Sequence, residues 1–116
     1  MKVKIPKTLR SGLLVYEVKM NDNLHWDSNL EGLCNHRTKE IAIDPRSPFP
    51  DETLIHEKLE QINWSYALEL EHKLLSQLSF AFAEFIKHDL NIEFDWSDIE
   101  EIIGVVLKVN GGEDKQ

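Results

Sequence analysis

The amino-acid sequence predicts an α+β protein in which a small antiparallel sheet packs on an αα-hairpin, followed by a C-terminal helix. Strand-like segments with β-branched or alternating apolar residues extend as far as Asp44. Two helical patterns then run between residues 51 and 88, joined by a short link as in an αα-hairpin. The capping box Ser97-Asp98-Ile99-Glu100 marks the start of a further helix.

The N-terminal part of the chain alternates between strand-like and turn-like segments. Four segments have the residue types of strands: Lys2 to Ile5, Leu13 to Lys19, Leu30 to Asn35 and Glu40 to Asp44. The last two flank the turn-like residues 36–39 and should form a hairpin, in which Ile41 and Ile43 share the buried face. Asn21 to Asn29 is rich in Asn and Asp and reads as a loop.

The predicted first helix follows three prolines, which end the hairpin and keep the chain extended. Asp51 should cap this helix, with Glu52 in the first turn, where negative charge suits the helix dipole. One stripe of its residues has the spacing of a buried helix face: Ile55, Leu59, Ile62 and Tyr66. His56 and Glu60 lie at the edge of that stripe, where a side chain is supported and still open to a cleft.

The second and third helices are predicted from the same spacing of apolar residues. The second should run from Leu70 to His88, and its expected core face contains Leu74, Leu75, Leu78, Phe82, Phe85 and Ile86. The third should begin at Ser97 and bury Ile99, Ile102, Ile103 and Val106. We expect one domain over residues 1–109 and a flexible tail over residues 110–116.

Composition narrows the classes of partner. The 116-residue chain has a net charge of −8, which argues against nucleic acid, because phosphate binding requires a basic patch. The apolar run within residues 1–20 is too short and too charged for a signal peptide or a membrane span. Cys34 is the only cysteine, so no internal disulfide is possible. We therefore expect a cytoplasmic protein with no membrane contact.

His56, Glu60 and His72 form a candidate metal site. Positions four apart share a helix face, so His56 and Glu60 can hold one ion between them. His72 is far enough along the chain to return on the second helix and supply a third ligand. Two imidazoles and a carboxylate are a ligand set of catalytic zinc, with the fourth position left for water. The spacing alone also fits an ordinary solvated helix face.

Glu57 is the candidate general base. It follows the first ligand directly, as the glutamate does in the His-Glu-x-x-His helix of zinc peptidases. In those enzymes the second ligand on the helix is a His, whereas here it is Glu60. Glu60 and His72 thus exchange ligand types relative to the zincin branch that has two His on the first helix and a Glu on the second, and the ligand charge is unchanged.

A hairpin, a helix with His-Glu and then a second helix is the order found in zincin-type peptidases. Four stretches extend this likeness: Gly32-Leu33-Cys34-Asn35, Ile41-Ala42-Ile43-Asp44, Thr53-Leu54-Ile55-His56-Glu57-Lys58-Leu59-Glu60-Gln61-Ile62-Asn63 and Leu68-Glu69-Leu70-Glu71-His72. Together they resemble a family of small phage and prophage proteins that look like metallopeptidases. That family has a Gly-x-x hairpin, a Thr-Leu-x-His-Glu-x-x-Glu-Ala-Ile-Asn helix and a Leu-x-Leu-x-His second element.

The resemblance covers about residues 31 to 88 and implies both the ligands and the base. It implies that His56, Glu60 and His72 bind Zn²⁺ and that Glu57 is the catalytic base. Gln61 departs from the family pattern, which has a small Ala there, and its larger side chain would crowd the cleft.

The other chemically notable residues have structural explanations. His25, in the predicted loop, is a weaker candidate for a fourth ligand. Cys34 fits a small buried hydrophobe, and His36 fits a turn. Three further residues are read as structural: His88 at a helix C-terminus, and Trp64 and Tyr66 as packing residues near the cleft. The acidic segment Asp89 to Glu101 reads as a solvated surface, which a basic partner could also use.

Two functions from different classes fit the sequence. The first is a metallopeptidase-like hydrolase that cleaves a peptide bond through zinc-activated water, with Glu40 to Asp44 pairing with an extended substrate. The second is a non-catalytic protein on the same scaffold that sequesters or inhibits a host protein. The partner is accordingly a peptide or a host protein, and the sequence does not set the oligomeric state.

Overall fold

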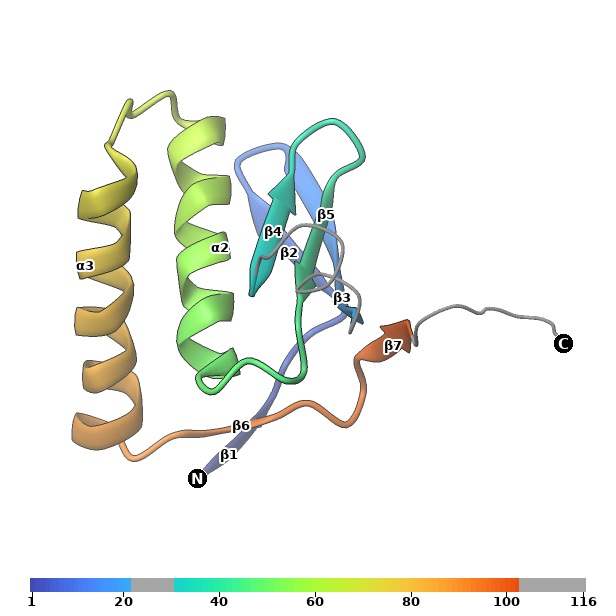
Figure 1. Ribbon diagram of the computed structural model, residues 1–116, viewed down its shortest axis with the longest axis vertical. Coiled ribbons are helices and arrows are strands. Elements are labelled where there is room, and N and C mark those ends of the chain that lie inside the picture. Colours follow the sequence, from blue (N-terminus) through green and yellow to red (C-terminus); the bar gives the residue numbers. More distant parts are fainter. Residues whose placement is uncertain (22–30, 103–116) are drawn as a thin grey trace, which may run out of the picture.

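The computed structural model describes residues 1–21 and 31–102, which form an α+β fold, as predicted (Figure 1). The strands are β1 (Lys2–Lys4), β2 (Thr8–Ser11), β3 (Leu14–Asn21), β4 (Gly32–Asn35), β5 (Glu40–Ile43), β6 (Glu93–Asp95) and β7 (Glu100–Ile102). The helices are α2 (Pro50–Ser65) and α3 (His72–Glu84), and α3 continues as the π-helical turn η1 (Phe85–Asp89). Of the predicted loop Asn21 to Asn29, Asn21 is the last residue of β3, and the rest, including His25, lies outside the described residues, as does the predicted tail at 110–116.

The main sheet is mixed rather than antiparallel. Its strand order is β2-β3-β5-β4, and β7 pairs with β3 beyond the end of β2. The β2–β3 and β4–β5 pairs are antiparallel, whereas β3 pairs in parallel with both β5 and β7. The predicted hairpin of β4 and β5 is therefore present, but it joins β3 through β5. Parallel β1 and β6 form a separate small sheet at the base of the molecule (Figure 1).

This strand order corrects the predicted edge strand. The segment Glu40 to Asp44 was expected to lie at the sheet edge and to pair with a substrate. Strand β5 instead lies between β3 and β4, so both of its sides are used. Within the described residues, β4 pairs only with β5 and is the outer strand on this side.

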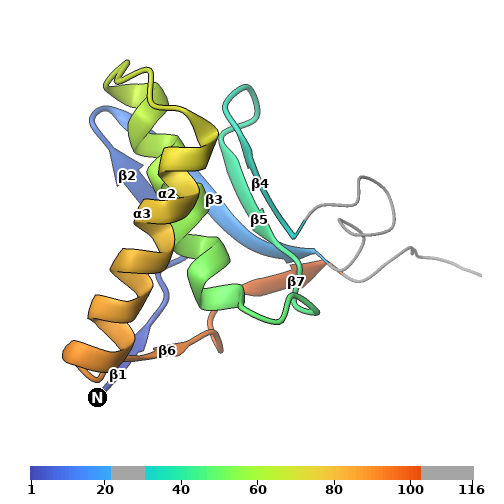
Figure 2. The ribbon, with the colours of Figure 1, turned by 60° about the vertical axis from the view of Figure 1, so that its left-hand side comes forward.

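The helices form two further layers beside the sheet. Helix α2 contacts β2, β4 and β5, and α3 packs on the opposite side of α2 (Figures 1 and 2). The predicted helix pair is confirmed, although only α2 covers the sheet. Pro50 is at the first helical position and Phe49 is the N-cap, so Asp51 lies in the first turn rather than at the cap.

The predicted buried face of α2 was wrong, and that of α3 was right only in part. The residues of α2 that are buried are Thr53, Leu54, Glu57 and Gln61. The predicted stripe from Ile55 to Ile62 is only partly buried and Tyr66 is exposed, because the sheet lies against the neighbouring, more polar face of α2. On α3, Leu75 is buried while Leu74, Phe82 and Phe85 are exposed, because α3 is the outermost layer and no described element covers its outer face (Figure 1).

The hydrophobic core lies between the sheet and α2. Its buried members are Ile5, Tyr16, Val18, Ile41, Ile43, Leu54 and Ile99. Ile41 and Ile43 are fully buried, which confirms the period-two pattern predicted for β5. None of the helices in the described residues is long and apolar enough to cross a membrane.

The predicted C-terminal helix was wrong over the residues that the structure describes. The Ser97 amide is hydrogen-bonded to Asp95 Oδ1 at 2.9 Å, so Ser97 belongs to a turn and caps no helix. Ile99 enters the core, and Glu100–Ile102 extends along the edge of β3 that β2 leaves open. Ladder hydrogen bonds and core burial together outweigh the local capping-box preference. The rest of the predicted helix lies outside the described residues.

Candidate metal centre

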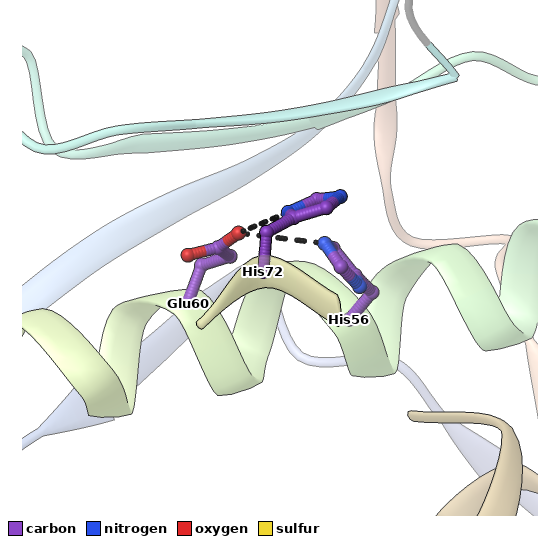
Figure 3. A group of neighbouring side chains, drawn as sticks. All are labelled: His56, Glu60 and His72. Carbon is purple, nitrogen blue, oxygen red and sulfur yellow. Dashed lines mark hydrogen bonds and ion pairs between the residues drawn. The ribbon is translucent and has the colours of Figure 1, made fainter. Parts of the chain in front are cut away.

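Helix α2 and the first turn of α3 bring the three predicted ligands together. His56 and Glu60 are one helical turn apart on α2, and His72 is the first residue of α3. Glu60 Oε2 lies 3.4 Å from His56 Nε2 and 3.3 Å from His72 Nδ1 (Figure 3). The two imidazoles meet edge to face, with ring centroids 4.9 Å apart. All three side chains point toward a common centre.

These separations fit a tetrahedral zinc ion. Two ligand atoms that are each about 2.0–2.1 Å from the metal lie about 3.4 Å apart in tetrahedral geometry. The three candidate ligand atoms lie within 4.8 Å of one another, and two of the three pairs are already near the tetrahedral separation. Both contacts are longer than an ordinary hydrogen bond, which has an optimum near 2.9 Å.

The centre is open on one side. His56 and Glu60 are partly buried, with 13% and 26% of their side chains exposed, whereas the His72 side chain is 75% exposed. A zinc ion held by three protein ligands keeps a fourth position, as catalytic zinc sites do. Because His72 is exposed, that position would lie next to solvent, where a water molecule and a substrate could both reach it.

Glu57 lies beside the cluster on the sheet-facing side of α2. The residue is 7% exposed, and its carboxyl group has no hydrogen-bond partner among the described residues. The pKa of Glu57 is raised from its usual value near 4.5 to about 8, mainly by burial and also by the nearby Glu60 and Glu52 carboxylates. A buried carboxyl group that can gain and lose a proton near neutral pH has the property required of a general acid–base group.

Gly32 allows β4 to approach Glu57 closely. A Cβ atom at this position would lie 2.5 Å from Thr53 Cγ2 and 2.8 Å from Glu57 Oε2, both too short for non-bonded contact. Any larger residue here would therefore require Thr53 and Glu57 to shift or the strand to move away from α2. The close approach brings the backbone of the outer strand to the carboxyl group proposed as the base.

Cys34 and His36 follow Gly32 at every second position and also face α2. Burial raises the pKa of the Cys34 thiol to about 12, with contributions from Glu57 and Glu60, so this thiol stays protonated. Its partial burial and high pKa agree with the predicted role of a small packing residue.

His36 is more than the turn residue that the sequence suggested. Its Nδ1 lies 2.8 Å from the hydroxyl of the buried Tyr16, and its ring stacks on Trp64 at 4.4 Å between centroids. Burial raises the pKa of Tyr16 and lowers that of His36, although Glu60 opposes the second shift. The lowered pKa favours a neutral ring, and a ring that accepts a hydrogen bond from the Tyr16 hydroxyl at Nδ1 would carry its proton on Nε2.

One expectation about the cleft was wrong, and three residues of the site were not predicted. Gln61 does not crowd the cleft, because it is fully buried and donates a hydrogen bond to the Leu9 carbonyl of β2 at 2.9 Å. The contributions of Gly32, Tyr16 and His36 were missed from the sequence. The alternation of residues 32, 34 and 36 along β4 could have indicated Gly32 and His36, but it gains meaning only once β4 is known to lie over α2.

No protein-family model, curated protein or solved structure matches this chain. The chemistry of the cluster is therefore argued from its donor atoms, their spacing and the burial of the groups around them.

Proposed function

We propose that this protein is a zinc-binding, metallopeptidase-like hydrolase of phage or prophage origin that acts in the host cytoplasm. His56, Glu60 and His72 are the zinc ligands and Glu57 is the catalytic base. The observation that supports this best is the convergence of three donors within 4.8 Å of one another, two of their pairs near tetrahedral spacing, beside a buried, high-pKa carboxyl group. Neither feature alone would be enough, since surface His–Glu pairs are common.

The roles follow from the positions of the side chains. Zinc in such a set lowers the pKa of a bound water to about 7 and polarises a carbonyl oxygen. Glu57 removes the proton from the attacking water and passes it to the leaving amine. In the metal-free protein this group exists in both forms near neutral pH, as a residue that first accepts and then donates a proton requires. The close approach of β4 at Gly32 limits the access of bulk water to this carboxyl group.

Strand β4 and His36 supply the substrate side of the cleft. The outer side of β4 offers backbone groups to an extended peptide, which would add to the sheet as a further strand. At the end of β4, His36 carries a proton on Nε2 that can be donated to a peptide carbonyl. Trp64 and Tyr16 fix the plane and tautomer of the ring, so little reorganisation accompanies that hydrogen bond.

Glu57→Gln tests the proposal. This change keeps the side-chain shape and removes the base, so turnover of host-lysate peptides should fall by on the order of 10²-fold or more. Zinc content and the circular dichroism spectrum should match those of the wild type, because Glu57 is not a ligand. Glu84→Gln, on the exposed surface of α3, is the matched control and should retain full turnover. Undiminished turnover in Glu57→Gln would exclude the hydrolase mechanism.

A non-catalytic binding protein is the second candidate. It is favoured by the apolar outer face of α3, where Leu74, Phe82 and Phe85 are 39%, 46% and 49% exposed. Exposed apolar patches on a charged protein commonly mark interaction sites. If this function is the correct one, Phe82→Glu should abolish the effect on phage growth while Glu57→Gln leaves it intact. A hydrolase predicts the reverse order of effects.

A further inference from the structure

A cavity of about 450 Å³ adjoins Glu60 on the side away from His56. Its lining residues come from three places, namely the turn after β4, the last turns of α2 and the loop that leads to α3. They are His36, Glu60, Asn63, Trp64, Ala67 and Glu69. The cavity therefore lies beside a proposed metal ligand, where a side chain of a bound peptide could be accommodated.

One wall of the cavity is a fixed aromatic surface. Trp64 stacks on His36 with an interplanar angle of 9°, and the hydrogen bond from Tyr16 holds His36 in turn. Trp64 nevertheless remains 61% exposed, so much of its ring surface is available to a ligand. The face of an indole ring attracts cations more strongly than that of any other side chain.

The loop between α2 and α3 forms another part of the lining, and Asn63 ties it to α2. The Leu70 amide donates to Asn63 Oδ1 at 2.9 Å, and Asn63 Nδ2 donates to the Leu70 carbonyl at 3.4 Å. Ala67 and Glu69 both have left-handed backbone conformations, with φ of 52° and 58°. Because Asn63 hydrogen-bonds to Leu70, the backbone that carries Glu69 at the cavity is tied to α2.

The cavity lining is negatively charged. Its two carboxylates are Glu60 and Glu69, and it contains no Lys or Arg. When the negative charge of Glu60 is used by a metal, that of Glu69 remains available. An aromatic face opposite a carboxylate matches a guanidinium or ammonium group, which can stack on the ring and pair with the acid at once. The net charge of −8 also attracts cationic ligands over a longer range.

We infer that this cavity is a specificity pocket for an arginine or lysine side chain of the bound peptide. The inference rests on the proposed function in one respect, namely that the peptide lies in the cleft beside Glu60. The pocket sets which peptides bind, whereas Glu57 and the metal ligands set whether they are cleaved. Binding and cleavage can therefore be measured apart.

The test measures peptide binding to zinc-loaded Glu57→Gln protein, which should not cleave its ligand. The probes are acetylated, amidated Ala-Ala-Xaa-Ala-Ala peptides in which Xaa is Arg, Lys, citrulline, Phe or Glu. Binding is followed through the indole N–H resonance of Trp64. We expect the Arg peptide to bind roughly tenfold more tightly than the citrulline peptide, its neutral isostere, and the Glu peptide to bind least.

Glu69→Gln in the same background should remove the preference for Arg over citrulline. Glu71→Gln is the matched control, since Glu71 is exposed, lies in the same loop and does not line the cavity; it should keep the preference. Equal binding of the Phe or citrulline peptide would overturn the inference. So would a preference that survives Glu69→Gln, or no binding of any peptide at about 1 mM.

The two proposals fail in different ways. An Arg preference that depends on Glu69, with no cleavage by the wild type, would leave the pocket standing and remove the hydrolase. Cleavage by the wild type that depends on Glu57 but does not discriminate Arg from citrulline would support the hydrolase and rule out the specificity pocket.

Discussion

Acidic residues in the first turn of helix α2 and in its middle have different surroundings. In the first turn, Asp51 forms an ion pair with Lys87 and accepts a hydrogen bond from Trp96 Nε1 at 2.8 Å. Glu52 accepts a hydrogen bond from Ser79 on α3. Further along the helix, Glu57 is more deeply buried than either and has no hydrogen-bond donor among the described residues.

Asp51 and Glu52 make contacts that stabilise the fold, whereas Glu57 is buried without such contacts. Polar groups buried for structural reasons are nearly always hydrogen-bonded, and the contacts of Asp51 and Glu52 tie α2 to α3, η1 and the segment after β6. A buried carboxyl group with no partner costs stability, so its presence next to candidate metal ligands points to chemistry. Changing each type of acid should therefore have effects of opposite sign.

Glu57→Gln should stabilise the metal-free protein at high pH. The pKa of Glu57 is raised from near 4.5 to about 8, so the folded protein binds the proton more tightly than the unfolded chain. Its stability contribution is fully present below pH 4.5 and is lost as the pH rises through 8. Between low pH and about pH 8.5, the metal-free wild type should lose about 4 kcal/mol of unfolding free energy that the variant keeps. Urea denaturation across this pH range measures the difference.

Bound zinc should change this pH dependence of stability. A nearby cation favours the carboxylate form of Glu57, so zinc-loaded wild type should lose less stability between pH 5 and pH 8 than the metal-free protein. If metal-free wild type and Glu57→Gln show parallel stability profiles over this range, Glu57 does not titrate in the folded state as described.

Asp51→Ala should lower the unfolding free energy, by somewhat less than Glu57→Gln raises it at high pH. It removes the acceptor shared by Lys87 and Trp96 and leaves both donors partly buried without their partner. We expect a loss of about 3 kcal/mol in unfolding free energy that varies little above pH 5. Asp89→Ala, at an exposed position, serves as the control and should change stability by less than about 0.5 kcal/mol. Equal losses in the two variants would show that the Asp51 contacts contribute little.

Ser79→Ala should have the smallest effect of the series. The Ser79 hydroxyl is fully buried between α2 and α3 and donates to Glu52. Its removal should cost about 1 kcal/mol, the usual net value of a side-chain hydrogen bond. Ser76→Ala, on the same helix, is the matched control. A loss near zero for Ser79→Ala would mean that water replaces the hydroxyl at Glu52.

Much of the fold could be predicted from the sequence because its signals are local. The β4–β5 hairpin, the two helices and the α+β class follow from alternation, from helical spacing and from prolines at the boundaries. The C-terminal helix was mispredicted because Ile99 and the strand Glu100–Ile102 are positioned by pairing with β3, which lies far away in the sequence. The buried face of α2 was mispredicted for a related reason, since the sheet covers the side with Glu57 and Gln61.

The candidate site likewise contains some residues that local patterns place and others that only tertiary packing places. His56 and Glu60 could be placed together from helical periodicity, and His72 from the length of the link between the helices. The burial of Glu57 and the role of Gly32 depend on how closely β4 approaches α2, which no local pattern encodes. His36 could not be assigned because Tyr16 and Trp64, which fix its ring, come from β3 and α2.

The zinc content of the protein tests the central claim most directly. Tag-free wild type, purified without added metal, should contain close to one zinc ion per chain by elemental analysis. His56→Ala, Glu60→Ala and His72→Ala should each remove it and abolish the rise in unfolding temperature that zinc produces. His88→Ala, at an exposed position in η1, should keep the metal. Wild type that contains no zinc, and whose unfolding temperature does not respond to added zinc, would contradict the metal centre.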